Sequence, residues 1–221
     1  MTARNRNFLT VDDEWLASYA AGGLTSFKRL AIDCQAAIEP GLEPRLAAFD
    51  AIGGAFLEAS QGEALSGDFM ERMFGALGAQ ETARVEEPDD AAKSDDWMPA
   101  PLRRFLASSD ITLNWRKAGP GIERAALCEE GGERLYLLRA KPGLKLPVHT
   151  HRGEEWTLIL QGGYHVGEEG YGAGDLHRED ESCLHQPVID DDGVCISLVV
   201  DEGKLKFRHP LLKLLQPLIG I

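Results

Sequence analysis

Long apolar segments are missing from this sequence, which nowhere contains the run of about 18 apolar residues that a membrane span needs. The residues after Met1 are polar, and no apolar stretch of the kind found in secretory signals follows them. The cysteines form no Cys-x2-Cys pair, and the four are Cys34, Cys128, Cys183 and Cys195. This spacing favours thiols in a reducing compartment over a disulfide framework. We therefore expect a cytoplasmic protein that does not associate with a membrane.

Basic residues are few relative to acidic ones, with 23 Lys and Arg against 36 Asp and Glu and a net charge of −13. Residues 1–100 carry a net charge of −10, whereas residues 101–221 carry only −3. Direct binding of nucleic acid is disfavoured, because phosphate contacts need clustered Lys and Arg. An acidic N-terminal half suits a basic protein partner, although solubility alone is the simpler explanation of the charge.

Histidine is missing from the N-terminal half, since none precedes His149, and Cys34 is the only thiol of residues 1–100. A zinc site built from His and Cys side chains cannot form from a single ligand. We expect the N-terminal part to fold without zinc, with Cys34 as a buried apolar residue.

The C-terminal half contains a pair of histidines, His149 and His151, two residues apart. On a β-strand both imidazoles point to the same face. Glu155 can reach the same point from the next strand after a turn. Two imidazoles and a carboxylate are typical ligands of a divalent transition metal. His185 is the natural candidate for a fourth ligand from a later strand.

Two further residues are candidates for the surroundings of this metal. His177 could line the same pocket. Cys183 lies two residues before His185, so both side chains share a face of a regular strand. A thiol near a metal is a candidate for oxidation, although burial as an inert core residue is the simpler explanation.

The N-terminal half is predicted to be helical. Acidic residues at positions 12–14 suit a helix start, and apolar residues recur at helical spacing with breaks at Gly and Pro. The predicted helices cover residues 12–21, 25–37, 43–59 and 66–77. Residues 81–100 lose the apolar pattern and are rich in acids, which is typical of a flexible linker.

The C-terminal half is predicted to be a β-sandwich or barrel, because short apolar segments alternate with glycines. The predicted strands cover residues 123–129, 133–139, 144–149, 156–160, 164–166, 175–178 and 195–200. The apolar tail, residues 210–219, is expected to pack back onto one of the domains.

Residues 143–162 resemble the first conserved motif of the cupin barrels, in which Gly, His, His, Glu and Gly follow one another at fixed spacing. Residues 174–185 are similar to the second motif, a Gly-Asp turn followed by a His. The resemblance implies a double-stranded β-helix, or jelly roll, with one divalent metal. Zinc is expected, and iron, manganese and nickel are compatible. The implied ligands are His149, His151, Glu155 and His185.

Nearly the whole chain resembles the ChrR-type anti-sigma factors. In that family a zinc-binding helical domain sequesters a group IV (extracytoplasmic-function, ECF) sigma factor, and a C-terminal cupin makes release respond to singlet oxygen or related oxidants. Residues 16–22 and 49–57 are similar to the first and third helices of that domain, but its His-x3-Cys-x2-Cys zinc motif is absent here. The partner-binding residues that the resemblance implies are Trp15, Leu16, Tyr19, Phe49 and Phe56.

The expected organisation is α+β and multidomain: a helical anti-sigma-like domain (residues 1–80), an acidic linker (81–100) and a metal-binding cupin (101–221). The expected function is that of an anti-sigma factor whose cupin senses oxidative stress or a small ligand, and we do not expect an enzyme. One alternative is a cupin-type metal-dependent dioxygenase or isomerase with a helical appendage. Another is a sugar- or acid-binding cupin of the storage type. A stand-alone enzyme has no need of the helical module, which favours the regulator.

Overall fold

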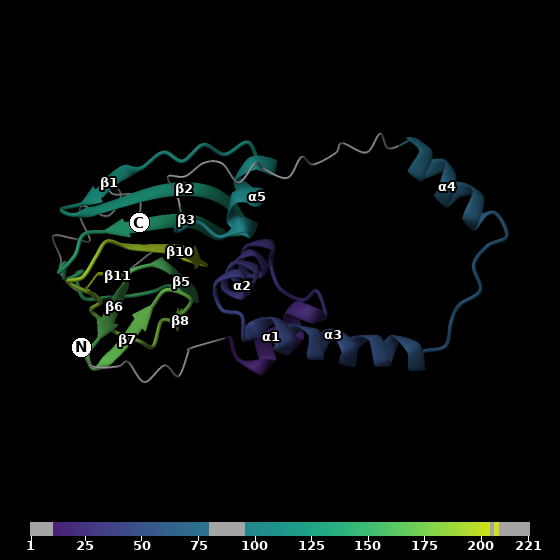
Figure 1. Ribbon diagram of the computed structural model, residues 1–221, viewed down its shortest axis with the longest axis horizontal. Coiled ribbons are helices and arrows are strands. Elements are labelled where there is room, and N and C mark those ends of the chain that lie inside the picture. Colours follow the sequence, from purple (N-terminus) through teal and green to yellow (C-terminus); the bar gives the residue numbers. More distant parts are fainter. Residues whose placement is uncertain (1–10, 80–95, 204–205, 208–221) are drawn as a thin grey trace.

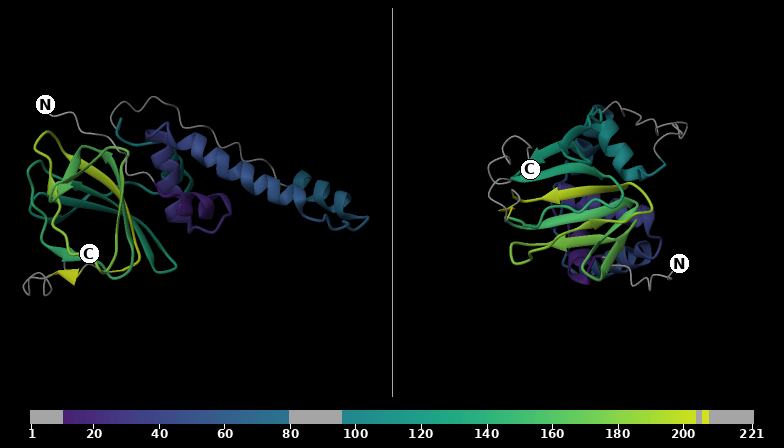
Figure 2. Two further views of the ribbon diagram at one scale, coloured as in Figure 1. Left: turned by 90° about the horizontal axis from the view of Figure 1, so that it is seen from below. Right: turned by 90° about the vertical axis from the view of Figure 1, so that its left-hand side faces the viewer.

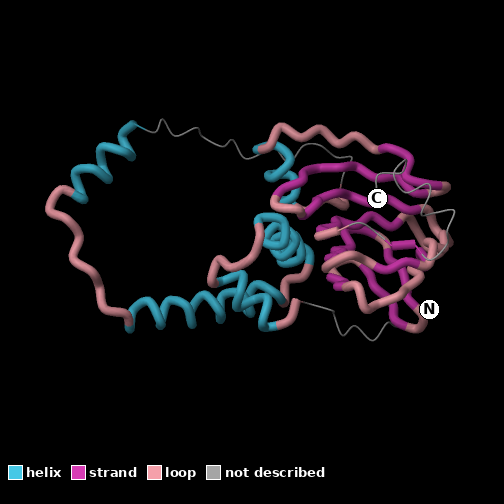
Figure 3. Tube along the Cα trace, turned by 180° about the vertical axis from the view of Figure 1, so that it is seen from behind, coloured by secondary structure: helices cyan, strands magenta, loops and turns pink. Residues whose placement is uncertain are grey.

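The computed structural model describes residues 11–79, 96–203 and 206–207. Helices and strands are segregated in space as well as in sequence, as Figures 1 and 3 show. The predicted order of a helical part followed by a β-barrel is confirmed. Most of the expected linker and the apolar tail at residues 210–219 lie outside the described residues.

Five helices are described, and none of them is long and apolar enough to cross a membrane. They are α1 (Asp13–Ala20), α2 (Ser26–Ile38), α3 (Leu42–Ala59), α4 (Phe69–Ala79) and α5 (Ala100–Ser108). The Oγ1 atom of Thr25 accepts a hydrogen bond from the backbone N–H of Lys28 and so caps the start of α2. Gly22, with φ of +72°, allows the chain to turn sharply after α1.

The strands form antiparallel sheets that enclose an interior cavity. They are β1 (Arg116–Gly119), β2 (Ile122–Glu130), β3 (Glu133–Ala140), β4 (His149–Thr150), β5 (Glu155–Gln161), β6 (Gly163–Val166), β7 (Glu169–Gly172), β8 (Leu176–Glu179), β9 (Val188–Ile189), β10 (Cys195–Asp201) and β11 (Lys206–Phe207). The largest sheet has the order β1-β2-β3-β10-β5-β8, a second has the order β7-β6-β9, and β11 pairs with β4.

The two faces of the six-stranded sheet have different neighbours. Along β10, Cys195, Ser197 and Val199 line the interior cavity, whereas the residues between them belong to the core shared with the helices. This alternation follows from the two-residue period of a strand. The same strands therefore build the wall of the cavity and the platform for the helices.

Helices α1, α2 and α5 contribute to one hydrophobic core with the outer face of this sheet. The ring of Trp15 on α1 meets that of Trp156 on β5 edge to face, with centroids 4.9 Å apart. The Nε2 atom of Gln35 on α2 donates a hydrogen bond of 3.0 Å to the carbonyl of Gly174. A Cβ atom at Gly174 would lie 3.2 Å from the side chain of Ile38, so glycine permits this close approach.

Residues 51–76, here called the arm, comprise the C-terminal part of α3, the connection that follows and most of α4. The arm extends away from the rest of the molecule (Figures 1 and 2), and nearly all of its residues are exposed. Its exposed large apolar residues are Ile52, Phe56, Leu57, Leu65, Met70 and Phe74. Phe56 and Leu57 are each 76% exposed.

Several predicted boundaries differ from the structure. The predicted strand over residues 144–149 is reduced to His149–Thr150, because Pro147 has no N–H for a ladder. Strands β1, β7, β9 and β11 were not predicted. Helix α5 was not predicted either, and residues 97–98, assigned to the linker by sequence, pack in the core beside it: Met98 is 6% exposed.

Candidate metal centre

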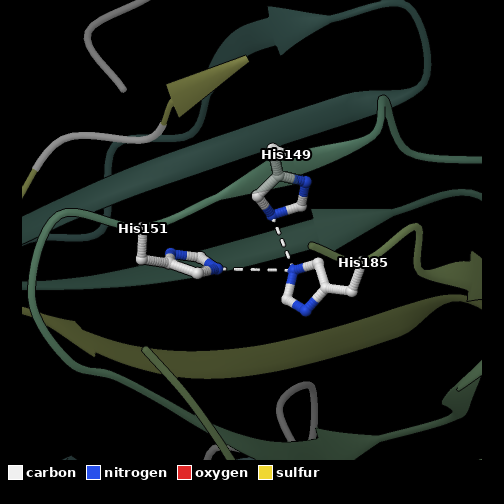
Figure 4. A group of neighbouring side chains, drawn as sticks. All are labelled: His149, His151 and His185. Carbon is white, nitrogen blue, oxygen red and sulfur yellow. Dashed lines mark hydrogen bonds between the residues drawn. The ribbon is translucent and has the colours of Figure 1, made fainter. Parts of the chain in front are cut away.

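Three buried histidines face one another across a short gap, two from the segment at β4 and one from the segment before β9 (Figure 4). The Nε2 atom of His185 lies 3.0 Å from Nε2 of His149 and 3.3 Å from Nε2 of His151. None of the three residues is more than 7% exposed. The structure thus brings together three of the four ligands that the sequence predicted.

Backbone pairing holds two of these histidines in register. The N–H of His149 donates to the carbonyl of His185, and the N–H of His185 donates to the carbonyl of His149, at 3.1 and 3.0 Å. His151 follows His149 by two residues, so the strand period turns its ring toward the same side.

The other ring nitrogen, Nδ1, lies next to an oxygen atom in all three histidines. These oxygens are the carbonyl of Pro147 at 2.8 Å from His149, Glu155 Oε2 at 3.3 Å from His151, and Glu179 Oε1 at 2.8 Å from His185. A proton on Nδ1 directed at such an oxygen leaves the Nε2 lone pair facing the common point. Metal-binding histidines in proteins are oriented in this way.

The spacing of the nitrogens fits a divalent transition metal. Bonds from zinc to imidazole nitrogen are about 2.0–2.1 Å long, so two nitrogens on one ion lie roughly 2.9–3.4 Å apart in octahedral or tetrahedral geometry. The two distances given above fall in that interval. Three lone pairs that face one another also have no hydrogen to share, and a cation between them would resolve this conflict.

Glu155, the fourth predicted ligand, stands at the edge of the histidine cluster. Its carboxylate contacts the Nδ1 atom of His151 and accepts a hydrogen bond of 3.1 Å from Thr157. Burial raises the pKa of the Glu155 carboxyl, but its contacts with His151 outweigh this effect and lower the pKa below the usual value. An ionised, partly buried carboxylate is therefore available beside the cluster.

The histidines themselves differ in protonation. Burial lowers the pKa of His149 to about 4, which keeps its ring neutral and able to bind a metal at neutral pH. Burial acts in the same direction on His151, but the hydrogen bond and charge of Glu155 raise its pKa above the ordinary value.

A second group of polar side chains lies behind His185. Glu179 Oε1 is 2.7 Å from His177 Nε2 and also contacts His185. The hydrogen bond from Cys183 to Glu179, together with burial, raises the pKa of the thiol to about 11, so Cys183 is protonated and a weak nucleophile at neutral pH. Sequence reasoning named His177 and Cys183 but missed Glu179, although its spacing of two residues from His177 places both on one strand face.

The interior cavity has a volume of about 340 Å³ and borders the cluster, with His149, Glu155, His177 and His185 in its wall. Most of the remaining wall is apolar, with side chains from β2, β3, β9 and β10. Cys183 is not among the lining residues.

Of the five residues expected to bind a partner, four contact other parts of this chain and one is widely exposed. Leu16 is fully buried, and Trp15 packs against the barrel. Tyr19 donates a hydrogen bond to Asp33, and Phe49 packs against the shared core. Among them only Phe56 is widely exposed, and it lies on the arm.

Comparison with known proteins covers almost the whole chain. Residues 105–205 match the ChrR cupin-like domain family. The chain is 34% identical over 212 residues to the anti-sigma-E factor ChrR of Cereibacter sphaeroides, which covers 96% of this chain and 97% of that protein. It is also similar to the ChrR chain in a crystal structure of Rhodobacter sphaeroides SigE in complex with the anti-sigma ChrR. That match has a TM-score of 0.72 and 30% identity, and it covers 86% of this chain and 97% of the other chain. These similarities confirm the expected cupin fold.

Proposed function

This chain belongs to the ChrR family of anti-sigma factors, and from that premise we propose that its helices sequester a group IV sigma factor while its cupin binds a metal and controls release. The observation that carries the proposal is the arm. An apolar surface held away from the molecule on two helices has no partner among the described residues of its own chain. Exposed apolar patches on soluble proteins mark interaction sites.

The sigma-binding surface is proposed to centre on Phe56, Leu57 and Phe74 of the arm, which are at least 60% exposed. Leu16 is not part of this surface, because it is buried against the chain's own barrel. The acidic charge of residues 1–100 would accelerate association with a basic partner. The anti-sigma unit is accordingly proposed to include α1–α4, and it would act in the cytoplasm.

The test is direct binding of the full-length protein to a group IV sigma factor from the same genome. Phe56→Asp and Phe74→Asp should each weaken binding about 30-fold or more, since a central interface residue contributes about 2 kcal/mol or more. Ala126→Asp changes an exposed residue on β2 and serves as the control, with unchanged affinity expected. Equal affinity of the arm variants and wild type would refute the proposed surface, and no binding by the wild type would refute the anti-sigma function.

The metal is proposed to be zinc, held by His149, His151 and His185. Glu155 is the proposed fourth ligand, and its carboxylate would turn from the Nδ1 atom of His151 toward the Nε2 atoms to bind the ion. Iron, manganese and nickel are the alternatives that metal analysis would reveal. A bound divalent ion would supply a buried positive charge with affinity for oxygen donors. The helical part is proposed to carry no zinc.

Strand β5 is the proposed connection between the cupin and the helices. Glu155 faces the cavity, while its neighbour Trp156 packs against Trp15 on the outer face. Glu154, which precedes Glu155 in the sequence, accepts a hydrogen bond of 2.8 Å from Lys28 on α2. A change at the metal centre, whether caused by an oxidant or by a ligand, would therefore reach residues that touch α1 and α2.

A further inference from the structure

The interior cavity is larger than a metal site alone requires. Its volume of about 340 Å³ is within the range of pockets that hold small organic molecules. Its apolar wall includes Ile122, Leu138, Leu144, Leu146, Ile189 and Val199. An apolar body of several carbon atoms is the natural occupant, because it would leave water for a wall that offers water few partners.

Polar groups in the wall are connected to the histidine cluster. Glu155 contacts the cluster through His151, and the Tyr164 hydroxyl lies 2.7 Å from Nδ1 of His177, whose Nε2 contacts Glu179 beside His185. This network gives the cavity a polar side at the proposed metal centre, opposite in character to its apolar wall. A molecule that matches both regions has one polar head and an apolar body.

The charge of the proposed metal ion favours a negative head. Among the described residues that line the cavity, Glu155 is the only carboxylate, and Lys145 also lines it. Lys145 is exposed, so it must lie where the cavity meets solvent and can attract anions toward the opening. Inside, the proposed divalent ion would carry two positive charges, of which Glu155 neutralises one. The remaining positive charge would attract the negative head of a ligand, because a buried charge is stabilised by an opposite charge.

We propose that this cavity binds a small apolar monocarboxylate, an aliphatic or aromatic acid. Its carboxylate lies at the side formed by His149, Glu155 and His185, and its body lies against Leu138, Leu144 and Val199. The inference rests on the proposed function in that it makes this acid the ligand that the cupin senses. The bound acid would then contact Glu155 at the start of β5, the strand that also contacts the helices.

The test is calorimetric titration of the zinc-loaded full-length protein with acetate, butyrate and hexanoate. Each methylene that enters the apolar wall should strengthen binding about fourfold, so hexanoate should bind on the order of 100-fold more tightly than acetate. Hexanol, which has the body without the charged head, should bind at least tenfold more weakly than hexanoate. Protein freed of metal should also bind hexanoate at least tenfold more weakly.

Two variants locate the site. Leu138→Trp fills the cavity and should reduce hexanoate affinity at least tenfold while zinc content is unchanged. Glu168→Trp places the same side chain on an exposed position between β6 and β7, outside the cavity lining, and should leave affinity unchanged. The chain-length series on the wild-type protein keeps the test valid even if Leu138→Trp does not fold.

Three outcomes would overturn the proposal: affinity that does not depend on chain length, hexanol that binds as tightly as hexanoate, or hexanoate binding that is insensitive to metal. No sigma factor is present in these titrations. Failure here therefore leaves the anti-sigma function untouched, whereas failure of sigma binding leaves a positive titration standing.

Discussion

Glu179 connects the histidine cluster to the side chains behind it. It contacts the Nδ1 atom of His185 and the Nε2 atom of His177. Burial raises the pKa of the Glu179 carboxyl, but the contacts with the two histidines outweigh burial and hold this pKa well below its usual value. An acceptor that is ionised at neutral pH next to Nδ1 fixes the ring orientation of His185 and makes Nε2 a stronger donor to a metal. Glu179 is thus a positioning residue for the proposed metal centre.

Removing Glu179 should therefore weaken zinc binding without abolishing it. We expect Glu179→Ala to reduce zinc affinity about 10- to 100-fold, whereas His149→Ala, which removes one of the converging nitrogens, should lose most of the bound zinc. Competition with a chromophoric chelator measures the first effect, and metal analysis of the purified protein measures the second. Glu168→Ala removes an exposed carboxylate and is the matched control. Indistinguishable zinc affinities of Glu179→Ala and the control would contradict the positioning role.

The sequence predicted this neighbourhood because strand parity is a local property. The spacing of His149 and His151 is sufficient to place two rings on one face, and the structure brings His185 to them through a pair of backbone hydrogen bonds. The contact of Glu155 with His151 Nδ1, and the role of Glu179, depend on side-chain orientation across strands. Spacing along one strand does not determine that orientation.

Helix α2 is attached to the barrel through a buried charge cluster. The Nζ atom of Lys28 lies 2.8 Å from Glu154, 2.7 Å from Glu202 and 3.7 Å from Glu133, and its side chain is 8% exposed. It also lies over the rings of Trp15 and Trp156, at 5.4 and 5.5 Å from their centroids. Without this ammonium group, the buried Glu133 and the partly buried Glu154 would lose their shared positive partner.

Lys28→Ala should consequently destabilise the protein by about 3 kcal/mol, the lower end of the range for breaking a buried ion pair, because Glu202 is 40% exposed. Urea unfolding of full-length protein measures the change. Arg72→Ala serves as the comparison, because it removes an ion pair with Asp68 in which both side chains are at least 60% exposed. It should change the free energy of unfolding by less than about 0.5 kcal/mol. Equal effects of the two substitutions would show that the Lys28 cluster contributes no more than a surface pair.

Element boundaries were predictable where the local pattern was strong. The predicted helices over residues 25–37 and 43–59 match α2 and α3 to within a residue at each end, because Thr25 and the Pro40-Gly41 break mark their limits. Helix α5 escaped prediction because it begins where the expected acidic linker ends, with prolines at positions 99 and 101, although proline is well accommodated in a first helical turn. Strands as short as β4 and β9 carry no periodic signal at all.

The packing of the helices against the barrel is a further feature that the sequence did not predict. The apolar stripe of α1 was expected to face another protein, but Leu16 and Trp15 face β5 of the same chain. A stripe indicates that a face is covered and does not identify what covers it. Arg178 on β8 illustrates the same point: it pairs with Asp12 and Glu154 and lies 4.6 Å from the Trp15 centroid, contacts between segments far apart in sequence.

One core shared by helices and barrel predicts one unit of unfolding, so zinc bound in the cupin should stabilise α2 as much as the strands. Zinc at about 100 times its dissociation constant adds about 2.7 kcal/mol, which slows exchange through global unfolding about 100-fold. Hydrogen exchange with and without zinc should therefore show equal slowing in α2 and β10, which are in contact. The arm should not change, because its residues are nearly all exposed and exchange without global unfolding. Protection confined to the strands would mean that the helices open independently, and a signal at the metal could then reach the proposed sigma-binding surface only through local contacts such as Trp15 with Trp156.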